Sequence, residues 1–207
     1  MFEKQVEKCH YEFGRYFHKK RWISVWHQIS EVLEKSPSCV LDVGPGAGVL
    51  AALLKLQNIK VETADIDPDL NPSILLSSAK IPVDDNRYDC VCAFQVLEHL
   101  PYDEALSLFR EMVRVSKSQI VISLPDAKKV YRVLLDFPFI DNFSVFIPRP
   151  RFGQRKNKFD GEHYWEVNRE GFSLGKVVSD LSANAELLKT YRVPENPHHR
   201  FFIFHKW

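Results

Sequence analysis

The residues best suited to chemistry lie in one short stretch, an aspartate followed by three glycines at alternate positions. Asp42 ends an apolar run, and Gly44, Gly46 and Gly48 follow it. Glycine lets the backbone turn tightly and lets a ligand lie directly against the main chain. An apolar-faced helix is expected from Val49 onward. The stretch therefore predicts a strand, a glycine turn and a helix N-terminus that together cradle a nucleotide.

The glycine spacing separates two classes of nucleotide ligand. A dinucleotide fingerprint, Gly-x-Gly-x-x-Gly, would place its third glycine at position 49, where this chain has Val49. The order Asp-x-Gly-x-Gly-x-Gly, with Pro45 after the first glycine, resembles motif I of the class I S-adenosylmethionine-dependent methyltransferases. The resemblance implies that Asp42 lies near the ammonium group of the cofactor and that the glycines pass beneath its ribose. The alternative is a glycine-rich turn that binds nothing.

Three further segments follow in the order found in this family. Asp65 stands where the ribose-binding acid is expected, with Asp67 as the alternative and a merely solvated turn as a third interpretation. Ser77 occupies the position of the acid that usually holds the adenine amine, so weaker cofactor binding is expected. Gln95 follows the fourth apolar run, and the resemblance assigns it to the methionine arm. The expected cofactor-binding residues are Asp42, Gly44, Pro45, Gly46, Gly48, Asp65, Ile66, Ser77, Ser78, Ala79 and Gln95.

The methyl acceptor is less directly encoded, because methyl transfer from a sulfonium depends on alignment more than on any particular side chain. His163 is a candidate catalytic base for a hydroxyl or phenol, since the reference pKa of histidine lies near neutrality. The alternative is a histidine that anchors the following helix to the sheet. Glu98 and His99 are expected to shape the floor of the site or to cap a helix. The candidates for acceptor binding are His99, Tyr164 and Arg151.

Charge and composition limit the choice of partner. The chain has 28 Lys and Arg against 27 Asp and Glu, so no net field attracts nucleic acid or a membrane surface. A basic run from Arg149 to Lys158 leaves three interpretations open: a solvated loop, a site for an anionic acceptor, or contact with RNA. The near-neutral total makes a nucleic-acid partner the less favoured of these. We therefore expect a small-molecule acceptor, which the second interpretation makes anionic.

The cysteines and the N-terminus indicate the compartment. Cys90 and Cys92 are separated by one residue, fewer than in usual zinc sites, so free thiols and no metal site are expected. The N-terminus lacks the apolar core of a signal peptide, and no apolar run reaches about 18 residues. These features predict a cytoplasmic protein without a membrane span, in a reducing compartment.

The elements that position these residues alternate between strands and helices. This order predicts an α/β fold with a seven-stranded, mostly parallel sheet, helices on both faces and the last strand antiparallel. Strands are expected at residues 39–43, 60–66, 88–94, 119–124, 186–193 and 200–204, with a short edge strand after 72–78. Helices are expected at residues 6–34, 49–57, 101–115, 127–136 and 168–184. In the first helix a buried stripe is expected from Trp22, Ile23, Trp26, Ile29, Val32 and Leu33.

Residues 1–207 are expected to form one domain, with an N-terminal helical segment at 1–36. An irregular segment at 137–166 is expected to cover the acceptor, because long loops in compact domains are usually functional. The resemblance implies an S-adenosylmethionine-dependent methyltransferase with S-adenosylhomocysteine as product, acting at oxygen or nitrogen of a small-molecule or glycan-type acceptor. A non-catalytic cofactor-binding or partner subunit, which Ser77 favours, and an RNA methyltransferase are the alternatives.

Overall fold

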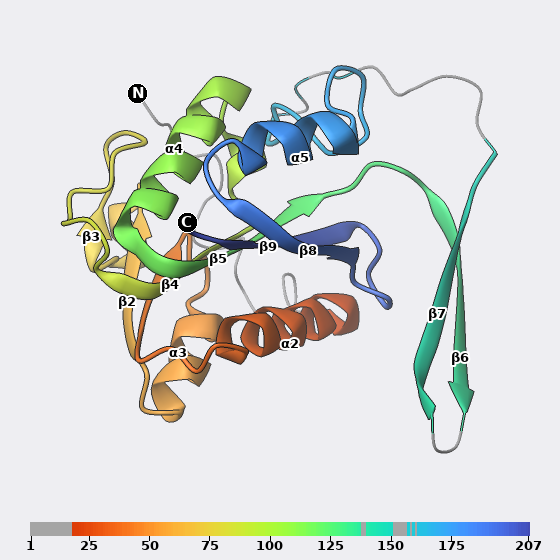
Figure 1. The fold of residues 1–207 in the computed structure, drawn as a ribbon, viewed down its shortest axis with the longest axis horizontal. Coiled ribbons are helices and arrows are strands. Elements are labelled where there is room, and N and C mark those ends of the chain that lie inside the picture. Colours follow the sequence, from red (N-terminus) through yellow and green to blue (C-terminus); the bar gives the residue numbers. More distant parts are fainter. Residues whose placement is uncertain (1–17, 138–139, 151–156, 158, 160) are drawn as a thin grey trace.

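A seven-stranded sheet forms the centre of the molecule, in the order β3-β2-β1-β4-β5-β9-β8 (Figure 1). The computed structural model describes residues 18–137, 140–150, 157, 159 and 161–207. Neighbouring strands from β3 to β5 run parallel, whereas β9 is antiparallel to both β5 and β8. The predicted fold class is confirmed. The strands are β1 (Cys39–Val43), β2 (Lys60–Asp65), β3 (Ile74–Leu75), β4 (Tyr88–Phe94), β5 (Ser116–Pro125), β8 (Glu186–Arg192) and β9 (His199–His205).

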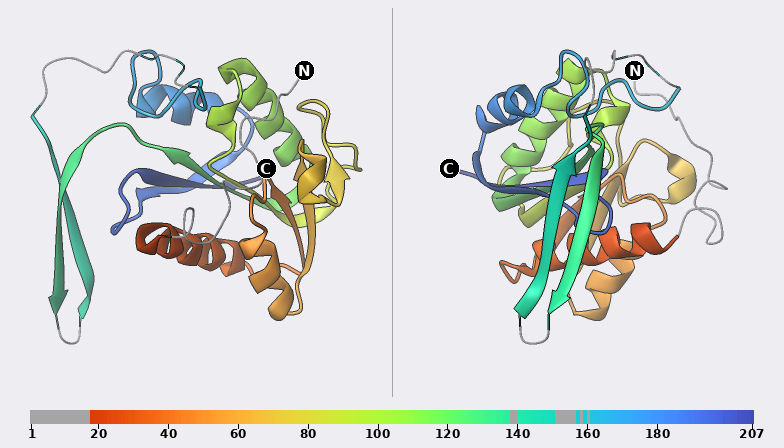
Figure 2. Two further views of the ribbon diagram at one scale, coloured as in Figure 1. Left: turned by 180° about the vertical axis from the view of Figure 1, so that it is seen from behind. Right: turned by 90° about the vertical axis from the view of Figure 1, so that its right-hand side faces the viewer.

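Helices cover both faces of the sheet and enclose two apolar clusters. Helices α2 and α3 lie on one face, and α4 and α5 lie on the other (Figures 1 and 2). Val32 and Leu54 belong to the first cluster, and Phe109 and Leu181 to the second; each is 0–1% exposed. The carboxyl ends of the parallel strands are thereby left as the open edge of the sheet. The helices are α2 (Lys19–Leu33), α3 (Val49–Leu56), α4 (Tyr102–Val115) and α5 (Leu174–Ser182).

The buried face of α2 differs in part from the predicted one. Trp26 is 63% exposed and Trp22 is 38% exposed, so the expectation that both lie in the buried stripe is wrong. The rest of the predicted stripe is confirmed, because Val32 is fully buried and Ile23, Ile29 and Leu33 pack against the same cluster. Val25, which the prediction left out, lies seven residues before Val32 on the same face of the helix and is also buried. Residues 1–17, which include the rest of the predicted helix, lie outside the described residues.

A two-stranded hairpin replaces the helix predicted at 127–136. Strands β6 (Val130–Phe137) and β7 (Ile140–Pro148) pair antiparallel and project from the body of the molecule (Figures 1 and 2). Strand β7 lies within the segment predicted to be irregular, so that expectation is corrected for these residues. Valine and tyrosine in β6 favour strand, and Val133 faces Val145 across the pair, which supplies cross-strand packing that an isolated helix would lack.

Helix α5 begins later than predicted. The hydroxyl of Ser173 accepts a hydrogen bond from the amide of Lys176 at 3.2 Å and so caps the N-terminus of the helix. Before it, Arg169 and Phe172 form an isolated antiparallel bridge, and Gly171 has a φ of 83°. The turn at this glycine prevents the helix from extending back to residue 168.

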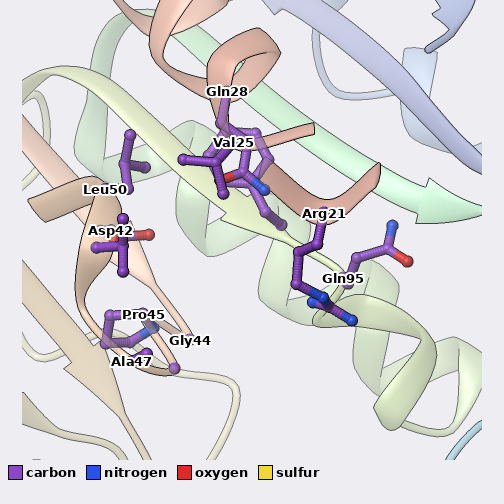
Figure 3. Close-up of a pocket in the computed structure, with 12 residues that line it drawn as sticks. Arg21, Val25, Gln28, Asp42, Gly44, Pro45, Ala47, Leu50 and Gln95 are labelled. Carbon is purple, nitrogen blue, oxygen red and sulfur yellow. The ribbon is translucent and has the colours of Figure 1, made fainter. Parts of the chain in front are cut away.

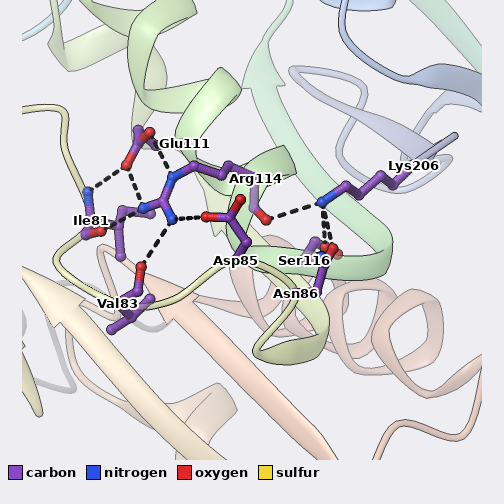
Figure 4. A network of polar contacts seen from close by, with 8 residues as sticks. All are labelled: Ile81, Val83, Asp85, Asn86, Glu111, Arg114, Ser116 and Lys206. Atoms are coloured by element: carbon purple, nitrogen blue, oxygen red, sulfur yellow. Dashed lines mark hydrogen bonds and ion pairs between the residues drawn. The ribbon is translucent and has the colours of Figure 1, made fainter.

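Arg114, in the last turn of α4, holds the loop that follows β3 against this helix (Figure 4). Its guanidinium donates to the carbonyl oxygens of Ile81 at 2.8 Å and Val83 at 2.9 Å, and it forms ion pairs with Asp85 and Glu111. Glu111 in turn accepts the amide of Ile81 at 3.1 Å. The network fixes the position of a loop whose first residues belong to the predicted cofactor site.

The described residues bear on the predicted absence of a membrane span and on the state of the cysteines. None of the helices that the structure describes has both the length and the apolar character needed to cross a membrane. Cys39, Cys90 and Cys92 are free thiols; Cys9 lies outside the described residues.

Candidate cofactor and acceptor site

The glycine turn connects β1 to α3 at the centre of the open edge. Gly44, Gly46 and Gly48 all have φ between 53° and 71°, the left-handed region that favours glycine. At Gly44 a side chain is also excluded by space, because a Cβ would lie 2.5 Å from Cγ2 of Val96. The segment after β4 therefore packs directly on the turn. This close approach brings the ends of β1 and β4 into one site.

A pocket lies between this turn, the end of β4 and the first three turns of α2 (Figure 3). The sequence-based prediction missed the contribution of α2. Arg21, Val25 and Gln28 are spaced at i, i+4 and i+7, which places them on one face of the helix, but that face could be assigned to the pocket only once the fold was known. The lining residues are Arg21, Val25, Gln28, Asp42, Gly44, Pro45, Gly46, Ala47, Val49, Leu50, Phe94 and Gln95.

Asp42 is the buried acid of this pocket. Its side chain is 2% exposed, and Oδ2 has no hydrogen-bond partner among the described residues. The thiol of Cys92 lies 3.7 Å from Oδ1. Burial raises the pKa of Asp42 to about 7. Since Arg21 lines the same pocket, the cavity combines a carboxyl and a guanidinium group, which complement a ligand that carries an ammonium and a carboxylate.

Gln95 is held in an unusual backbone conformation at the end of β4. Its φ is 59°, which is uncommon for a residue other than glycine. The amide of Gln95 donates to the carbonyl of Ser123 at 3.0 Å, and its Nε2 donates to the hydroxyl of Ser123 at 3.2 Å. Contacts with β5 thus maintain the strained turn, and the turn places the Gln95 side chain at the pocket.

The predicted ribose and adenine residues lie farther along the same edge and do not line the enclosed pocket. Asp65, at the end of β2, is partly buried, and burial raises its pKa. Asp67, the alternative acid, accepts the amide of Asp69 at 3.0 Å and so caps a short turn. The amide of Leu76 donates to the carbonyl of Asp65 at 2.7 Å. The remaining predicted residues flank this bond: Ile66 and Ala79 are partly buried, and Ser77 and Ser78 are exposed.

His99, predicted to bind the acceptor, and His163, the predicted base, come together with Glu98 in space. The two imidazole rings lie 4.9 Å apart in a T-shaped arrangement. Glu98 is fully buried, and burial raises its pKa to about 8. Tyr164 is 37% exposed and its ring lies 4.5 Å from that of Phe159. Arg151 lies outside the described residues. The site thus contains a carboxyl and two imidazoles near the end of β4.

A second cavity, of about 370 Å³, lies beyond the end of β5. Asp126, one of its lining residues, accepts hydrogen bonds from Arg192 at 2.8 Å and Arg200 at 2.9 Å. These bonds hold the pKa of Asp126 below its usual range although burial opposes them. Glu166 is paired with Arg169. Both acids are therefore neutralised, and the lining is cationic overall. The lining residues are Asp126, Ala127, Lys128, Lys129, Val130, Arg149, Glu166, Arg169, Pro197 and His198.

Comparison of the sequence with protein families identifies one match. The family is described as a methyltransferase domain, and its model matches residues 14–205. Comparison with curated proteins finds no match.

Solved structures with a similar fold share little sequence with this chain. The PH0226 protein of Pyrococcus horikoshii is 15% identical, with a TM-score of 0.64 over 98% of this chain and 100% of that one. The 1,6-didemethyltoxoflavin-N1-methyltransferase of Burkholderia thailandensis, bound to S-adenosylhomocysteine, is 16% identical, with a TM-score of 0.61 over 96% and 84%. Magnesium protoporphyrin IX methyltransferase of Synechocystis, bound to S-adenosylmethionine, is 13% identical, with a TM-score of 0.61 over 97% and 90%. These similarities establish the fold.

Proposed function

Because the chain belongs to the methyltransferase-domain family, we propose that it transfers a methyl group from S-adenosylmethionine to a small-molecule acceptor. The observation that carries the proposal is the pocket at the end of β1, which buried Asp42 and cationic Arg21 both line. The methionine arm of the cofactor is a zwitterion, so its ammonium group suits Asp42 and its carboxylate suits Arg21. The product, S-adenosylhomocysteine, keeps both groups and should bind in the same way.

The residues of this chain bind and orient the reactants. When bound, the cofactor supplies a methyl group activated by the sulfonium, and its transfer depends on alignment with the acceptor. Asp42 would hold the ammonium group, and Gln95 would contact the methionine arm. Asp65 would accept hydrogen bonds from the ribose hydroxyls, as a carboxylate at the end of a strand can do. Ser77 would meet the adenine amine through a neutral hydroxyl, which binds more weakly than a carboxylate.

For the acceptor we propose a small molecule that carries an anionic group and is methylated at oxygen or nitrogen. The second cavity supports this assignment, because three cationic side chains line it in addition to Arg169, which is paired with Glu166: Lys128, Lys129 and Arg149. Strands β4 and β5 are parallel neighbours, so their carboxyl ends meet at one edge of the sheet. An acceptor whose anionic group lies in the second cavity would thus extend along the same edge as the cofactor.

Calorimetric titration with S-adenosylmethionine and S-adenosylhomocysteine tests the cofactor assignment. We expect wild-type protein to bind both, and Arg21→Gln to weaken binding by about tenfold or more, the usual effect of losing one charged hydrogen bond. Lys19→Gln, which removes the same charge from an exposed position of the same helix, is the control and should bind as the wild type does. Wild-type protein that binds neither ligand would contradict the proposed function.

A methyl-transfer assay distinguishes an enzyme from the alternative, a non-catalytic subunit that only binds the cofactor. Protein that binds the cofactor is incubated with methyl-labelled S-adenosylmethionine and with hydroxyl and amine compounds that carry a carboxylate or phosphate. We expect transfer of label to at least one compound and an excess of the anionic acceptors among those methylated. Tight cofactor binding without transfer to any of them would favour the binding subunit.

A further inference from the structure

The carboxyl group of Glu98 is buried, and no described residue donates a hydrogen bond to it. The residue is 0% exposed, and neither of its oxygens has a hydrogen-bond partner among the described residues. An isolated buried carboxylate is costly, and proteins compensate for it by protonation, by an ion pair or by a metal ion. Two imidazoles are the nearest candidate partners. One ligand atom from each of Glu98, His99 and His163 lies within 4.8 Å of the others.

Both imidazoles are oriented through their Nδ1 atoms. Nδ1 of His163 lies 3.1 Å from Oε1 of Glu166, and Nδ1 of His99 lies 3.0 Å from the carbonyl oxygen of Glu162. Histidines that bind metals usually donate one ring N–H to a carboxylate or a backbone carbonyl, which fixes the tautomer. With the proton on Nδ1, the nitrogen that carries a lone pair for a metal is Nε2.

Backbone contacts hold these side chains in place. Glu98 and His99 belong to the short helix η3 (Leu97–His99) that follows the Gln95 turn. The amide of Tyr164 donates to the carbonyl of Glu98 at 2.9 Å, and Nε1 of Trp165 donates to the carbonyl of Leu100 at 3.1 Å. These two hydrogen bonds hold the segment that carries His163 against η3. The arrangement is defined by the fold and does not depend on flexible surface side chains.

We propose that Glu98, His99 and His163 form a binding site for one divalent transition-metal ion, such as Zn²⁺ or Mn²⁺. Two imidazoles and one carboxylate are a ligand set typical of such ions, and three protein ligands leave coordination positions open for another molecule. Ligands about 2.0–2.2 Å from one tetrahedrally coordinated ion lie about 3.3–3.6 Å apart. The three ligand atoms, which lie within 4.8 Å of one another, must therefore move closer together on binding, through rotations of the side chains. This proposal is an alternative to the predictions that the chain holds no metal and that His163 is a base.

Along the chain, the ligands of the site lie close to residues that line each of the two cavities. Glu98 follows Gln95, which lines the cofactor pocket, by three residues, and His163 precedes Glu166, which lines the second cavity, by three residues. The open positions of the ion are suited to oxygen or nitrogen atoms of the acceptor. This role rests on the proposed function, whereas metal binding itself does not.

Zinc and manganese titrations of tag-free protein, without cofactor or acceptor, test the site. We expect binding of one ion per chain by calorimetry, and a visible spectrum typical of Co²⁺ bound to nitrogen and oxygen ligands when Co²⁺ is added. Glu98→Gln and His163→Asn should each weaken binding by at least about tenfold, the lower range for loss of even an outer-shell partner. His205→Asn, at an exposed position at the end of β9, is the control and should not change binding.

Several results would overturn the site. They are wild-type protein that binds no ion, unchanged affinity in Glu98→Gln, or an equal loss in His205→Asn, which would indicate adventitious surface binding. S-adenosylhomocysteine binding by each variant shows that the variant is folded, and it separates the two proposals. Loss of metal binding with intact cofactor binding concerns this site alone, whereas metal binding without cofactor binding would leave the site standing and contradict the proposed function.

Discussion

Replacement of Asp42 by asparagine is expected to stabilise the folded protein and, at the same time, to weaken its binding of the cofactor. The carboxyl is buried, and one of its oxygens has no hydrogen-bond partner among the described residues. Asparagine has nearly the same shape and carries no charge. The substitution therefore removes the cost of a buried carboxylate from the ligand-free protein, and it also removes the group proposed to hold the ammonium of S-adenosylmethionine.

The stability effect can be worked out from the shift in pKa. Burial raises the pKa of Asp42 from 3.8 to about 7, so between these values the folded state retains a proton that the unfolded state has lost. The contribution of Asp42 to stability is complete below the unfolded pKa and is lost as the pH rises through the folded pKa. With about 1.4 kcal/mol per pKa unit, the wild type should lose about 2–3 kcal/mol relative to Asp42→Asn between about pH 5 and pH 8.

The affinity effect has the opposite sign. A hydrogen bond to a charged group contributes about 1.5–3 kcal/mol, so Asp42→Asn should weaken binding by about 10- to 150-fold above neutral pH. Below pH 7 the wild-type carboxyl is protonated in the free protein and must ionise to hold the ammonium group. The affinity of the wild type for the cofactor should therefore decline below pH 7 by up to about tenfold per pH unit. The affinity of the variant should not show this pH dependence.

Urea denaturation at several pH values and calorimetry with S-adenosylhomocysteine measure both effects. Asp89→Asn is a matched control with the opposite expected sign. Asp89 accepts the amides of Ser38 and Cys39 and pairs with Lys117, and the ion pair lowers its pKa. Asp89→Asn should therefore destabilise the protein and leave cofactor binding unchanged. An Asp42→Asn variant whose relative stability does not change with pH, or whose affinity equals that of the wild type, would refute the reasoning.

Four other predictions follow from individual residues. Gly46→Val should abolish cofactor binding in calorimetry, because φ at this position is 53° and a branched side chain would occupy the space of the ligand. Ser77→Asp should tighten binding by about 1 kcal/mol, through a charged hydrogen bond to the adenine amine; weaker binding would place the adenine elsewhere. Burial lowers the pKa of His199 to about 3, so in urea the wild type should lose about 3 kcal/mol of stability relative to His199→Gln as the pH drops from about 7 to 4. Amides of the β6–β7 hairpin should exchange faster than those of β4 in deuterium exchange, since an isolated pair of strands is only marginally stable.

The accuracy of the sequence-based prediction depended on whether neighbours along the chain determine the local structure. Tyr88–Phe94 was predicted with its observed bounds, because a parallel strand buried on both faces is a nearly continuous apolar run, interrupted here by Asp89. For residues 127–136 the apolar residues fit a helix, but β7, a partner farther along the chain, decides the conformation. The tryptophans of α2 were placed inside on grounds of hydrophobicity, although the orientation of that helix is set by its packing on the sheet.

The same distinction separates the two halves of the site. Asp42 and the glycines are contiguous, so their spacing alone indicates a ligand, whereas Arg21 comes from a helix whose inward face was unknown. His163 depends on the fold even more strongly. Taken alone, a histidine with a neutral reference pKa is a reasonable base, but the fold brings its segment against His99, whose ring bonds a carbonyl 63 residues away in the chain. Beside a second imidazole and a buried carboxyl, the same side chain has the surroundings of a metal ligand. The chemistry of His163 thus follows from contacts between segments far apart in the sequence, and metal titration of Glu98→Gln decides between the two roles.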